Sequence, residues 1–393
     1  MDSGQHMGGR GVKKSLMRYI STLLMAVLLL GVLAPAGAEI EIKPKGANVI
    51  STEDNGYMVT STIQTETMFH RMKGPGEQVI PLPALTLKAP PLVVGLGMEQ
   101  ENKGKPLKID NVGVENMSYA DSTIVMRETE DTVGYTDFKG QGYTVCHVVR
   151  VTVADPSQIR TAMSYDDYDT RRHARAQRMA EACNAVAAVD GDYFKNASER
   201  GFVFRQGVFY RDLAGGERDA LLIDSAGDFH AIYRATGESI RAAMDALPEG
   251  VEAVNVMNFG PVLVDHGVVA DIAGSTAGTA ENQQDMFEYR YRMPRAAIVQ
   301  LGKLEYAIVE CDAENTKGAT GMTMQTFADY IHEIFPDCLM AYNLDGGNST
   351  NVVIPRTGYN PTYGNREIQF TRIHYYPESR EICDMIYFAS LED

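Results

Sequence analysis

Two short acidic motifs follow apolar runs at separate points of this sequence. The run at residues 185–189 leads into Asp-Gly-Asp at 190–192, and the run at residues 339–344 leads into Asp-Gly-Gly at 345–347. A strand that ends in this way presents its carboxylates at a fixed point, and the glycines expose backbone N–H groups to an anion. Either motif alone is also typical of a tight turn whose Asp caps neighbouring N–H groups. Two such motifs in one chain favour a site.

Polar residues near these motifs suit a phosphate or a sugar. Asn348, Ser349 and Thr350 follow the second motif and supply amide and hydroxyl groups. Arg295 directly follows a proline at the start of a predicted strand. A guanidinium can donate two parallel hydrogen bonds to a phosphate, which a lysine cannot copy.

The elements that must position these residues are mainly strands. Apolar, β-branched runs separated by turn residues predict strands at 122–127, 143–153, 185–189, 220–224, 228–233, 251–256, 294–299, 304–309 and 339–344, and a hairpin at 262–269. A helical period appears at residues 170–184 and 324–335. The sequence therefore predicts an α+β fold, with a mixed, mostly antiparallel β-sheet core, interspersed helices and an extended N-terminal arm before it.

The N-terminus has the pattern of an export signal. Four basic residues precede an apolar stretch at residues 20–33, and a small-x-small pattern follows at 36–38. We expect residues 1–38 to be a cleaved signal peptide, residues 39–118 an arm or spacer rich in Pro and Gly, and residues 119–393 the main domain. This predicts a secreted or cell-surface protein with no membrane span after cleavage; an uncleaved anchor is the alternative.

Charge and cysteine content exclude several classes of protein. The 36 Lys and Arg residues against 52 Asp and Glu give a net charge of -16, which disfavours nucleic acid as a partner. Five cysteines without a C-x-x-C pair predict buried thiols rather than a zinc or redox motif. The eight histidines show no metal-ligand spacing, so no metal site is predicted, although Ca²⁺ or Mg²⁺ bound by the aspartates at 190, 192 and 345 stays open.

Four motifs in a fixed order carry a resemblance to a known family. Residues 184–194, 260–267, 294–298 and 343–350 resemble the phosphodiester glycosidases, the family of N-acetylglucosamine-1-phosphodiester α-N-acetylglucosaminidase. The similarity covers roughly residues 119–393, and its last part resembles the secreted bacterial branch.

The resemblance implies an enzyme that hydrolyses a sugar-1-phosphodiester to a free sugar and a phosphomonoester. Asp345 and Asp192 would then form the carboxylate pair that acts on water or on the anomeric carbon, with Asp190 next to them, and Arg295 would clamp the phosphate. The residues that would bind the substrate are Gly191, Tyr193, Phe194, Gly260, Pro261, Asn343, Gly346, Gly347, Asn348, Ser349 and Thr350. Which carboxylate is acid and which is base depends on their separation in space.

The sequence departs from the family pattern at several of these positions. Asp190 replaces a usual Asn, Ala296 a usual Thr and Asn348 a usual Gly, while residues 310–312 read Glu-Cys-Asp where Asp-Gly-Arg is usual. An acid in place of an amide adds negative charge beside a phosphate unless it is protonated or paired.

Two alternatives to a hydrolase follow from these departures and from the arm. The first is a catalytically silent module that binds a glycan or a phosphate with the same fold. The second is a protein of exopolysaccharide or envelope assembly in which the N-terminal arm is the working part. The expected partner of the enzyme is a glycan or sugar-phosphodiester substrate, and the sequence leaves the oligomeric state open.

Overall fold

A computed structural model gives the structure of residues 103–169, 172–192, 201–270, 289–313, 318–373 and 380–393, with residue 272 and the backbone of residues 68–73. The predicted signal peptide, most of the predicted arm, and Tyr193 and Phe194 lie outside the described residues.

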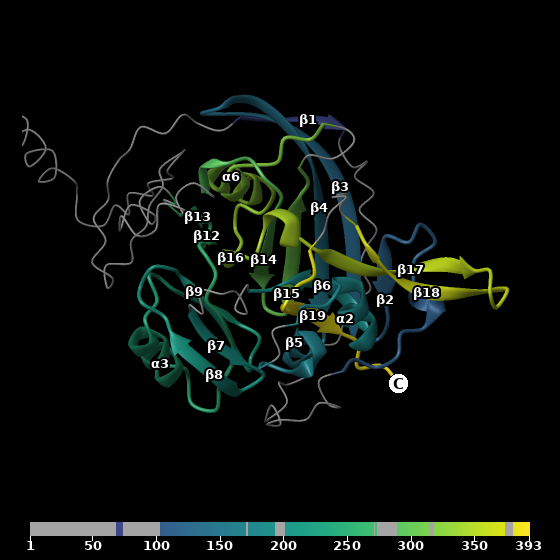
Figure 1. The fold of residues 1–393 in the computed structure, drawn as a ribbon, viewed down its shortest axis with the longest axis horizontal. Coiled ribbons are helices and arrows are strands. Elements are labelled where there is room, and N and C mark those ends of the chain that lie inside the picture. The colour runs from purple at the N-terminus through teal and green to yellow at the C-terminus, as the bar shows by residue number, and fades with distance from the viewer. Residues whose placement is uncertain are drawn as a thin grey trace, which may run out of the picture. The chain divides into compact units, whose positions relative to one another are not determined.

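The largest sheet has nine strands in the order β1-β3-β4-β15-β14-β16-β12-β13, with β2 paired to β3 (Figure 1). Its strands are β1 (Met68–Lys73), β2 (Ser118–Ala120), β3 (Ile124–Asp137), β4 (Gly140–Val153), β12 (Val262–Asp265), β13 (Val268–Val269), β14 (Arg295–Gly302), β15 (Glu305–Cys311) and β16 (Met340–Asn343). The hairpin of β3 and β4 is much longer than the short runs that the sequence predicts, because pairing continues past residue 127 to the turn at Gly140.

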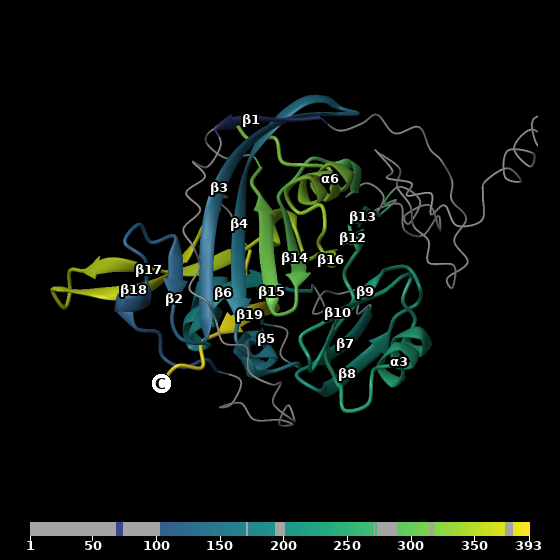
Figure 2. The same ribbon diagram turned by 180° about the vertical axis from the view of Figure 1, so that it is seen from behind.

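Two smaller sheets have five strands each. The α2 sheet, in the order β18-β17-β6-β19-β5, contains β5 (Ile159–Met163), β6 (Ala185–Asp190), β17 (Val352–Asn360), β18 (Asn365–Arg372) and β19 (Asp384–Ala389). The α3 sheet, in the order β10-β9-β11-β7-β8, contains β7 (Gly201–Arg205), β8 (Val208–Leu213), β9 (Ala220–Asp224), β10 (Phe229–Ile232) and β11 (Ala253–Met257). Figure 2 shows that the hairpin of β17 and β18 extends beyond β6, the other strand with which β17 pairs.

Every strand pair that the structure describes is antiparallel, and three α-helices lie among these strands. The α-helices of the described residues are α2 (Ala176–Ala182), α3 (Gly237–Asp245) and α6 (Met324–Ile334). The predicted mixed, mostly antiparallel fold is therefore confirmed. Short 3-10 turns are η2 (Ile109–Asn111), η3 (Pro156–Gln158), η4 (Ser164–Asp166) and η6 (Gly347–Ser349).

Helix α2 begins later than its sequence pattern predicts. Ala174 forms an antiparallel bridge with Ile382, and its N–H donates to the Ile382 carbonyl oxygen at 3.0 Å. Arg175 keeps extended dihedrals as the N-cap residue, so the helix starts at Ala176. Helix α6 begins where the pattern predicts it, because the Thr323 hydroxyl caps the helix by accepting from the Thr326 N–H.

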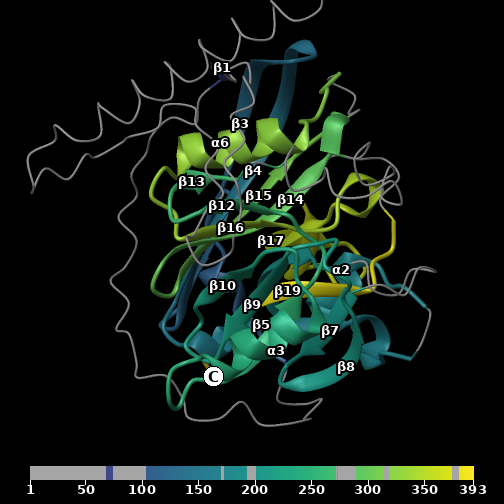
Figure 3. The same ribbon diagram turned by 90° about the vertical axis from the view of Figure 1, so that its left-hand side faces the viewer.

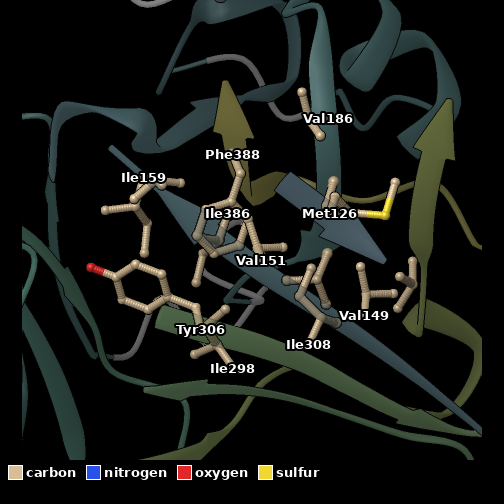
Figure 4. Close-up of a cluster of buried hydrophobic side chains, with 14 of the residues drawn as sticks. Met126, Val149, Val151, Ile159, Val186, Ile298, Tyr306, Ile308, Ile386 and Phe388 are labelled. Carbon is tan, nitrogen blue, oxygen red and sulfur yellow. The ribbon is translucent and has the colours of Figure 1, made fainter. Parts of the chain in front are cut away.

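All three sheets contribute to one central core. Figure 4 shows Val149 and Ile298 of the nine-stranded sheet near Val186 and Ile386 of the α2 sheet. The α3 sheet adds Leu221 to the same cluster. Burial of this much apolar surface is the main force that holds the sheets together.

The helices cover the opposite faces of the sheets. Helix α6 lies against the nine-stranded sheet (Figure 3). Its Phe327 and Ile331 pack with Ala297 and Val299 on the second face of that sheet. Helix α2 packs on the α2 sheet and helix α3 on the α3 sheet, each through a separate apolar cluster. No helix of the described residues is long and apolar enough to cross a membrane.

The described end of the predicted arm contacts the main domain. The Gly104 N–H donates to the Cys183 carbonyl oxygen at 2.9 Å, and the Lys105 N–H donates to the Ser390 carbonyl oxygen at 3.0 Å. Val112 is buried in the central core, and β1 pairs with β3. The boundary at residue 119 stays a prediction.

Candidate active site

The ends of two strands from different sheets bring the acidic motifs together. Strand β6 of the α2 sheet ends at Asp190, and strand β16 of the nine-stranded sheet ends two residues before Asp345. The Asp345 N–H donates to the Gly191 carbonyl oxygen at 3.0 Å. The negative charge of Asp345 acts on Asp190, and that of Asp192 acts on Asp345. The three aspartates therefore form one cluster.

Asp190 is buried and only half satisfied. Its Oδ1 accepts from the Asn351 N–H at 2.7 Å, whereas its Oδ2 has no hydrogen-bond partner among the described residues. Burial, together with the charges of Asp345 and Asp384, raises the pKa of Asp190 well above its usual range. This shift favours the protonated form of Asp190, and Oδ2 is the oxygen left to carry the proton.

Asp345 lies in a less enclosed position. Its Oδ1 accepts from the Gly346 N–H at 2.9 Å. Burial raises the pKa of Asp345 to about 7, although hydrogen bonds from Ser349 and Gly346 and the charge of Arg380 oppose this effect. A carboxyl group with this pKa exchanges its proton near neutral pH.

Asp192 is fixed by a buried arginine. The Arg205 Nη2 donates to Asp192 Oδ2 at 3.0 Å and to Asp384 Oδ2 at 2.9 Å, and the Arg205 Nε donates to Asp384 Oδ2 at 3.0 Å. The Asn258 N–H also donates to Asp192 Oδ2, at 2.9 Å. No hydrogen bond to Asp192 Oδ1 occurs among the residues described, so one of its oxygens is left for a ligand.

Asp384 completes this network from the start of β19. Its Oδ1 accepts from the Asp192 N–H at 2.8 Å. Burial raises the pKa of Asp384 to about 6, the charge of Arg205 opposes the shift, and the charge of Asp192 adds to it. Asp192 is therefore held rigidly, because Arg205 binds its side chain and Asp384 accepts from its backbone N–H.

Gly191 makes this close arrangement feasible. A Cβ atom at this position would lie 2.7 Å from Asp384 Oδ1 and 2.9 Å from Met257 Cε. Any larger residue would displace the Asp384 carboxylate.

The turn after β16 uses its own N–H groups internally. The Gly347 N–H donates to the Pro294 carbonyl oxygen at 3.0 Å, the Ser349 N–H to Gly346 at 3.1 Å, and the Thr350 N–H to Gly347 at 3.3 Å. These backbone groups are therefore occupied in the structure, whereas the sequence motif suggests that such groups bind an anion. The side chains of the turn are the groups that remain for a ligand.

The segment at 260–261 lies against the end of β16. The Asn343 side-chain amide donates to the Gly260 carbonyl oxygen at 2.8 Å, and the Asn343 N–H donates to the Pro261 carbonyl oxygen at 3.0 Å. The Gly260-Pro261 peptide bond is cis, and Gly260 has a φ of 72°, a conformation that glycine adopts readily.

Unpaired buried polar atoms gather around these motifs. Asp190 Oδ2, Asn343 Oδ1, Thr350 Oγ1 and both carboxylate oxygens of Glu310 are buried without a hydrogen-bond partner among the described residues. Folded proteins leave few such atoms, and those that occur mark functional sites or bound water and ions. The arrangement therefore has unfilled capacity to bind a polar ligand.

Arg295 occupies a supporting position. Its Nε donates to the Met322 carbonyl oxygen at 3.2 Å and its Nη2 to the Tyr291 carbonyl oxygen at 2.9 Å. It pairs in register with Cys311, whose side chain belongs to the cluster on the α6 face of the nine-stranded sheet. Arg295 is buried, and the preceding Pro294 accepts from the Gly347 N–H of the turn that begins at Asp345.

The sequence reasoning missed three charged residues of this site. Arg205 and Asp384 flank apolar strands, and an isolated charge at the end of such a strand is the signal that could have singled them out. Arg380 is exposed, and its charge acts on Asp345, but nothing in its local sequence distinguishes it.

Comparison with solved structures identifies similar folds at low identity. The catalytic domain of zebrafish N-acetylglucosamine-1-phosphodiester α-N-acetylglucosaminidase, auto-inhibited by its propeptide, aligns over 67% of this chain and 83% of that chain with a TM-score of 0.52 and 16% identity. A hypothetical protein from Synechocystis aligns with a TM-score of 0.42 and 15% identity over 67% of this chain and 62% of that chain. The first similarity supports a shared fold.

Comparison with protein families gives a direct assignment. No curated protein matched this sequence. The family model described as phosphodiester glycosidase matches residues 183–388, which contain both acidic motifs, Arg205, Arg295 and Asp384. Because this match spans more than half of the chain, the protein belongs to the phosphodiester glycosidase family.

Proposed function

We propose that this protein hydrolyses a sugar-1-phosphodiester to a free sugar and a phosphomonoester. Family membership supports this class of reaction. The observation that carries the proposal is the convergence of Asp190, Asp192 and Asp345 in three different environments, since this reaction needs carboxyl groups with distinct roles.

Asp345 is the proposed general base. A pKa of about 7 makes its carboxylate basic enough to accept a proton from water while staying largely ionised slightly above neutral pH. Water then adds to the anomeric carbon, the bond from that carbon to the phosphate oxygen breaks, and the bonding electron pair leaves with the phosphate. The water proton passes to Asp345. A phosphate monoester needs little acid assistance to leave.

Asp192 is the proposed stabiliser of positive charge at the anomeric carbon. Arg205 and the Asn258 N–H hold one of its oxygens, so the other is oriented without freedom to rotate. A pre-oriented carboxylate favours an oxocarbenium-like transition state more than it favours the ground state.

Asp190 is proposed to act as a neutral donor. The family pattern has an amide at this position, and an ionised acid there would repel the phosphate. Because burial and nearby carboxylates raise the pKa of Asp190, its protonated Oδ2 can donate a hydrogen bond as the amide would. This removes the electrostatic objection to the substitution.

Two arginines are proposed to serve the phosphate in different ways. Arg380 is exposed and close enough for its charge to act on Asp345, which suits direct contact with a phosphate. Arg295 is retained as the phosphate clamp that the family resemblance implies, and its bonds to Met322 and Tyr291 support the turn at 345–350. Thr350 Oγ1 and Asn343 Oδ1 are further candidates for substrate contacts, since both are unpaired.

The N-terminal sequence supports export, so we propose that the substrate is a glycan or an envelope polysaccharide outside the cytoplasm. The domain boundaries at residues 38 and 118 belong to the same proposal.

The test is an assay of residues 39–393 with a panel of sugar-1-phosphodiesters that includes α-N-acetylglucosamine-1-phospho-6-mannose. Free sugar and phosphomonoester should appear in equal amounts, and Asp345→Asn should abolish both. The matched control is Asp224→Asn, which changes a buried carboxylate that holds the β9–β10 turn instead. Binding of the diesters without release of either product, by a folded protein, would favour the silent binding module.

A further inference from the structure

A second group of buried ionisable residues lies beside the aspartate cluster. His147 of β4 and Glu310 of β15 are directly opposite each other in the antiparallel register, so their side chains share one face of the nine-stranded sheet. Asp312 follows β15 on the same segment. One ligand atom from each of His147, Glu310 and Asp312 lies within 4.8 Å of the others, and all three residues are buried.

Glu310 is the least satisfied carboxylate of the group. It is fully buried, and neither of its oxygens has a hydrogen-bond partner among the described residues. Buried carboxylate oxygens without a partner are rare in folded proteins and call for a proton, a water or an ion. A bound cation would satisfy both oxygens at once.

His147 is held in the orientation that is typical of metal ligands. Its Nδ1 lies 3.0 Å from Glu128 Oε1, and both side chains are buried. Metal-binding histidines almost always use the second ring nitrogen for such a bond to a carboxylate or carbonyl, because this fixes the ring and its tautomer. When Nδ1 donates to Glu128, the lone pair on Nε2 is available to a metal.

The charge of the group also favours a cation. Glu128, Glu310 and Asp312 contribute three buried carboxylates. The guanidinium groups that act on them are Arg372, whose charge acts on Glu310 and Asp312, and Arg356, which lies 3.9 Å from Glu128 Oε2. A buried excess of negative charge is costly unless a proton or a metal compensates it.

We propose that His147, Glu310 and Asp312 form a binding site for a divalent transition-metal ion, with Zn²⁺ as the preferred ion and Glu128 as the residue that orients His147. One imidazole and two carboxylates are a ligand set that Zn²⁺ accepts in sites with an open fourth position. Ligand atoms around Zn²⁺ lie about 3.4 Å apart at bond lengths of ~2.1 Å, so from separations within 4.8 Å the group needs to contract by at most about 1.4 Å. Ca²⁺ and Mg²⁺ prefer oxygen ligands throughout and should bind much more weakly.

The site is distinct from the proposed reaction centre, although the two are neighbours, since the charge of Asp190 acts on Glu310. Metal binding is measured without substrate. A failure to bind Zn²⁺ and a failure to hydrolyse diesters are therefore separate results.

The experiment is titration of chelator-treated residues 39–393 with ZnCl₂ by calorimetry, with metal content measured after dialysis. We expect one Zn²⁺ per chain and no displacement by equal concentrations of MgCl₂ or CaCl₂. Glu310→Gln and His147→Gln should each abolish binding at this site, and Glu128→Gln should weaken it by about 10–100-fold. The matched control is His230→Gln, since His230 also pairs with a carboxylate, Asp224, but belongs to no such group of ligands among the residues that the structure describes.

Two further measurements keep the proposal testable if a variant is unstable. Glu310→Gln replaces a buried carboxyl group whose oxygens have no hydrogen-bond partner among the described residues, so its melting temperature without metal should equal or exceed that of the chelator-treated parent, and added Zn²⁺ should not raise it. X-ray absorption at the zinc edge of the unmodified chain should show imidazole and oxygen ligands. Sulfur ligation, absence of Zn²⁺ binding by the parent, or unchanged binding by Glu310→Gln and His147→Gln would each overturn the proposal.

Discussion

Individual carboxyl groups in this protein differ more in environment than in type. Asp190, Asp345 and Asp384 are all aspartates near one point, yet the structure separates them by burial and by partner. Asp190 is buried and accepts from a backbone N–H; Asp345 is partly exposed beside Arg380; Asp384 is bound to Arg205. Such differences allow one small cluster to contain a donor, a base and a positioning residue.

Substitution at Asp190 should separate a donor role from an anionic role. Asp190→Asn keeps the shape and supplies an N–H donor, so we expect kcat/KM within about threefold of the parent. Asp190→Ala removes the acceptor of the Asn351 N–H as well, and should lower stability by about 1–3 kcal/mol and activity by more than tenfold. Steady-state kinetics and urea unfolding of both variants provide the comparison. Loss of activity in Asp190→Asn with a normal fold would mean that the ionised acid is required.

The pH dependence of activity should report on Asp345. Its pKa of about 7 means that the carboxylate form is lost as the pH falls through that value, so kcat/KM should rise with pH around 7 and then level off. Arg380→Gln removes a cation that stabilises the carboxylate, and should move the rise to higher pH. A profile that is flat between pH 5 and pH 8 would contradict the assignment of Asp345 as base.

At the scale of elements, the candidate site lies where the ends of strands β6, β7 and β19 meet. Strand β6 ends beside the start of β19, and Arg205 at the end of β7 reaches both. The α2 sheet and the α3 sheet are thus joined by a buried ion pair rather than by backbone pairing at this point.

Removal of Arg205 should therefore be costly. Arg205→Met leaves Asp192 and Asp384 together without their cation, so we expect a loss of about 3–5 kcal/mol in the free energy of unfolding. The double variant Arg205→Met with Asp384→Asn should recover part of that loss. Chemical denaturation measures the free energy of unfolding of both variants. Equal values for the single and the double variant would show that Arg205 and Asp384 are not coupled.

Gly191 should tolerate no side chain. Gly191→Ala places a methyl group against Asp384 and Met257, and we expect destabilisation by about 1–3 kcal/mol with a marked loss of activity. Gly302→Ala is the control, because its added Cβ would lie 3.6 Å from the nearest atom, a Glu305 oxygen. The test compares the melting temperature and the rate of product release of Gly191→Ala with those of Gly302→Ala. Similar values for the two variants would argue against a steric role of Gly191.

Most strands could be predicted from the sequence, because alternation and apolar runs depend on local burial. The runs at residues 185–189 and 339–344 correspond closely to β6 and β16. The length of the β3–β4 hairpin and the late start of α2 could not be predicted in this way. The first depends on pairing between two strands, and the second on the bridge between Ala174 and the distant Ile382.

The site was partly predictable for the same reason. The acidic motifs are local patterns, and the structure brings them together, whereas Arg205, Asp384 and His147 acquire meaning only through contacts between residues far apart in sequence. Arg295 illustrates the reverse case, because its motif is local but its hydrogen bonds are to Met322 and Tyr291, which the motif does not specify.

At the scale of the whole molecule, the buried acids should set the pH dependence of stability. The pKa values of Asp345 and Asp384, about 7 and about 6, lie above the value of about 4 for an unfolded aspartate. The folded state therefore binds protons more tightly, and stability falls as the pH rises from about 4 through 7.

Urea unfolding at pH 5 and pH 8 should show this difference directly, with the higher midpoint at pH 5. Asp345→Asn should reduce the difference, because one of the titrating groups is gone. A midpoint that rises between pH 5 and pH 8 would show that paired carboxylates dominate instead.

The five cysteines have a consequence for how the protein responds to oxidants. All are buried and reduced, and burial raises the pKa of Cys146, Cys183, Cys311 and Cys338. Thiolates are thus scarce and shielded from oxidants once folding is complete. The described fold uses no disulfide, so the chain should mature equally well in oxidising and reducing surroundings provided that it folds before its thiols are oxidised.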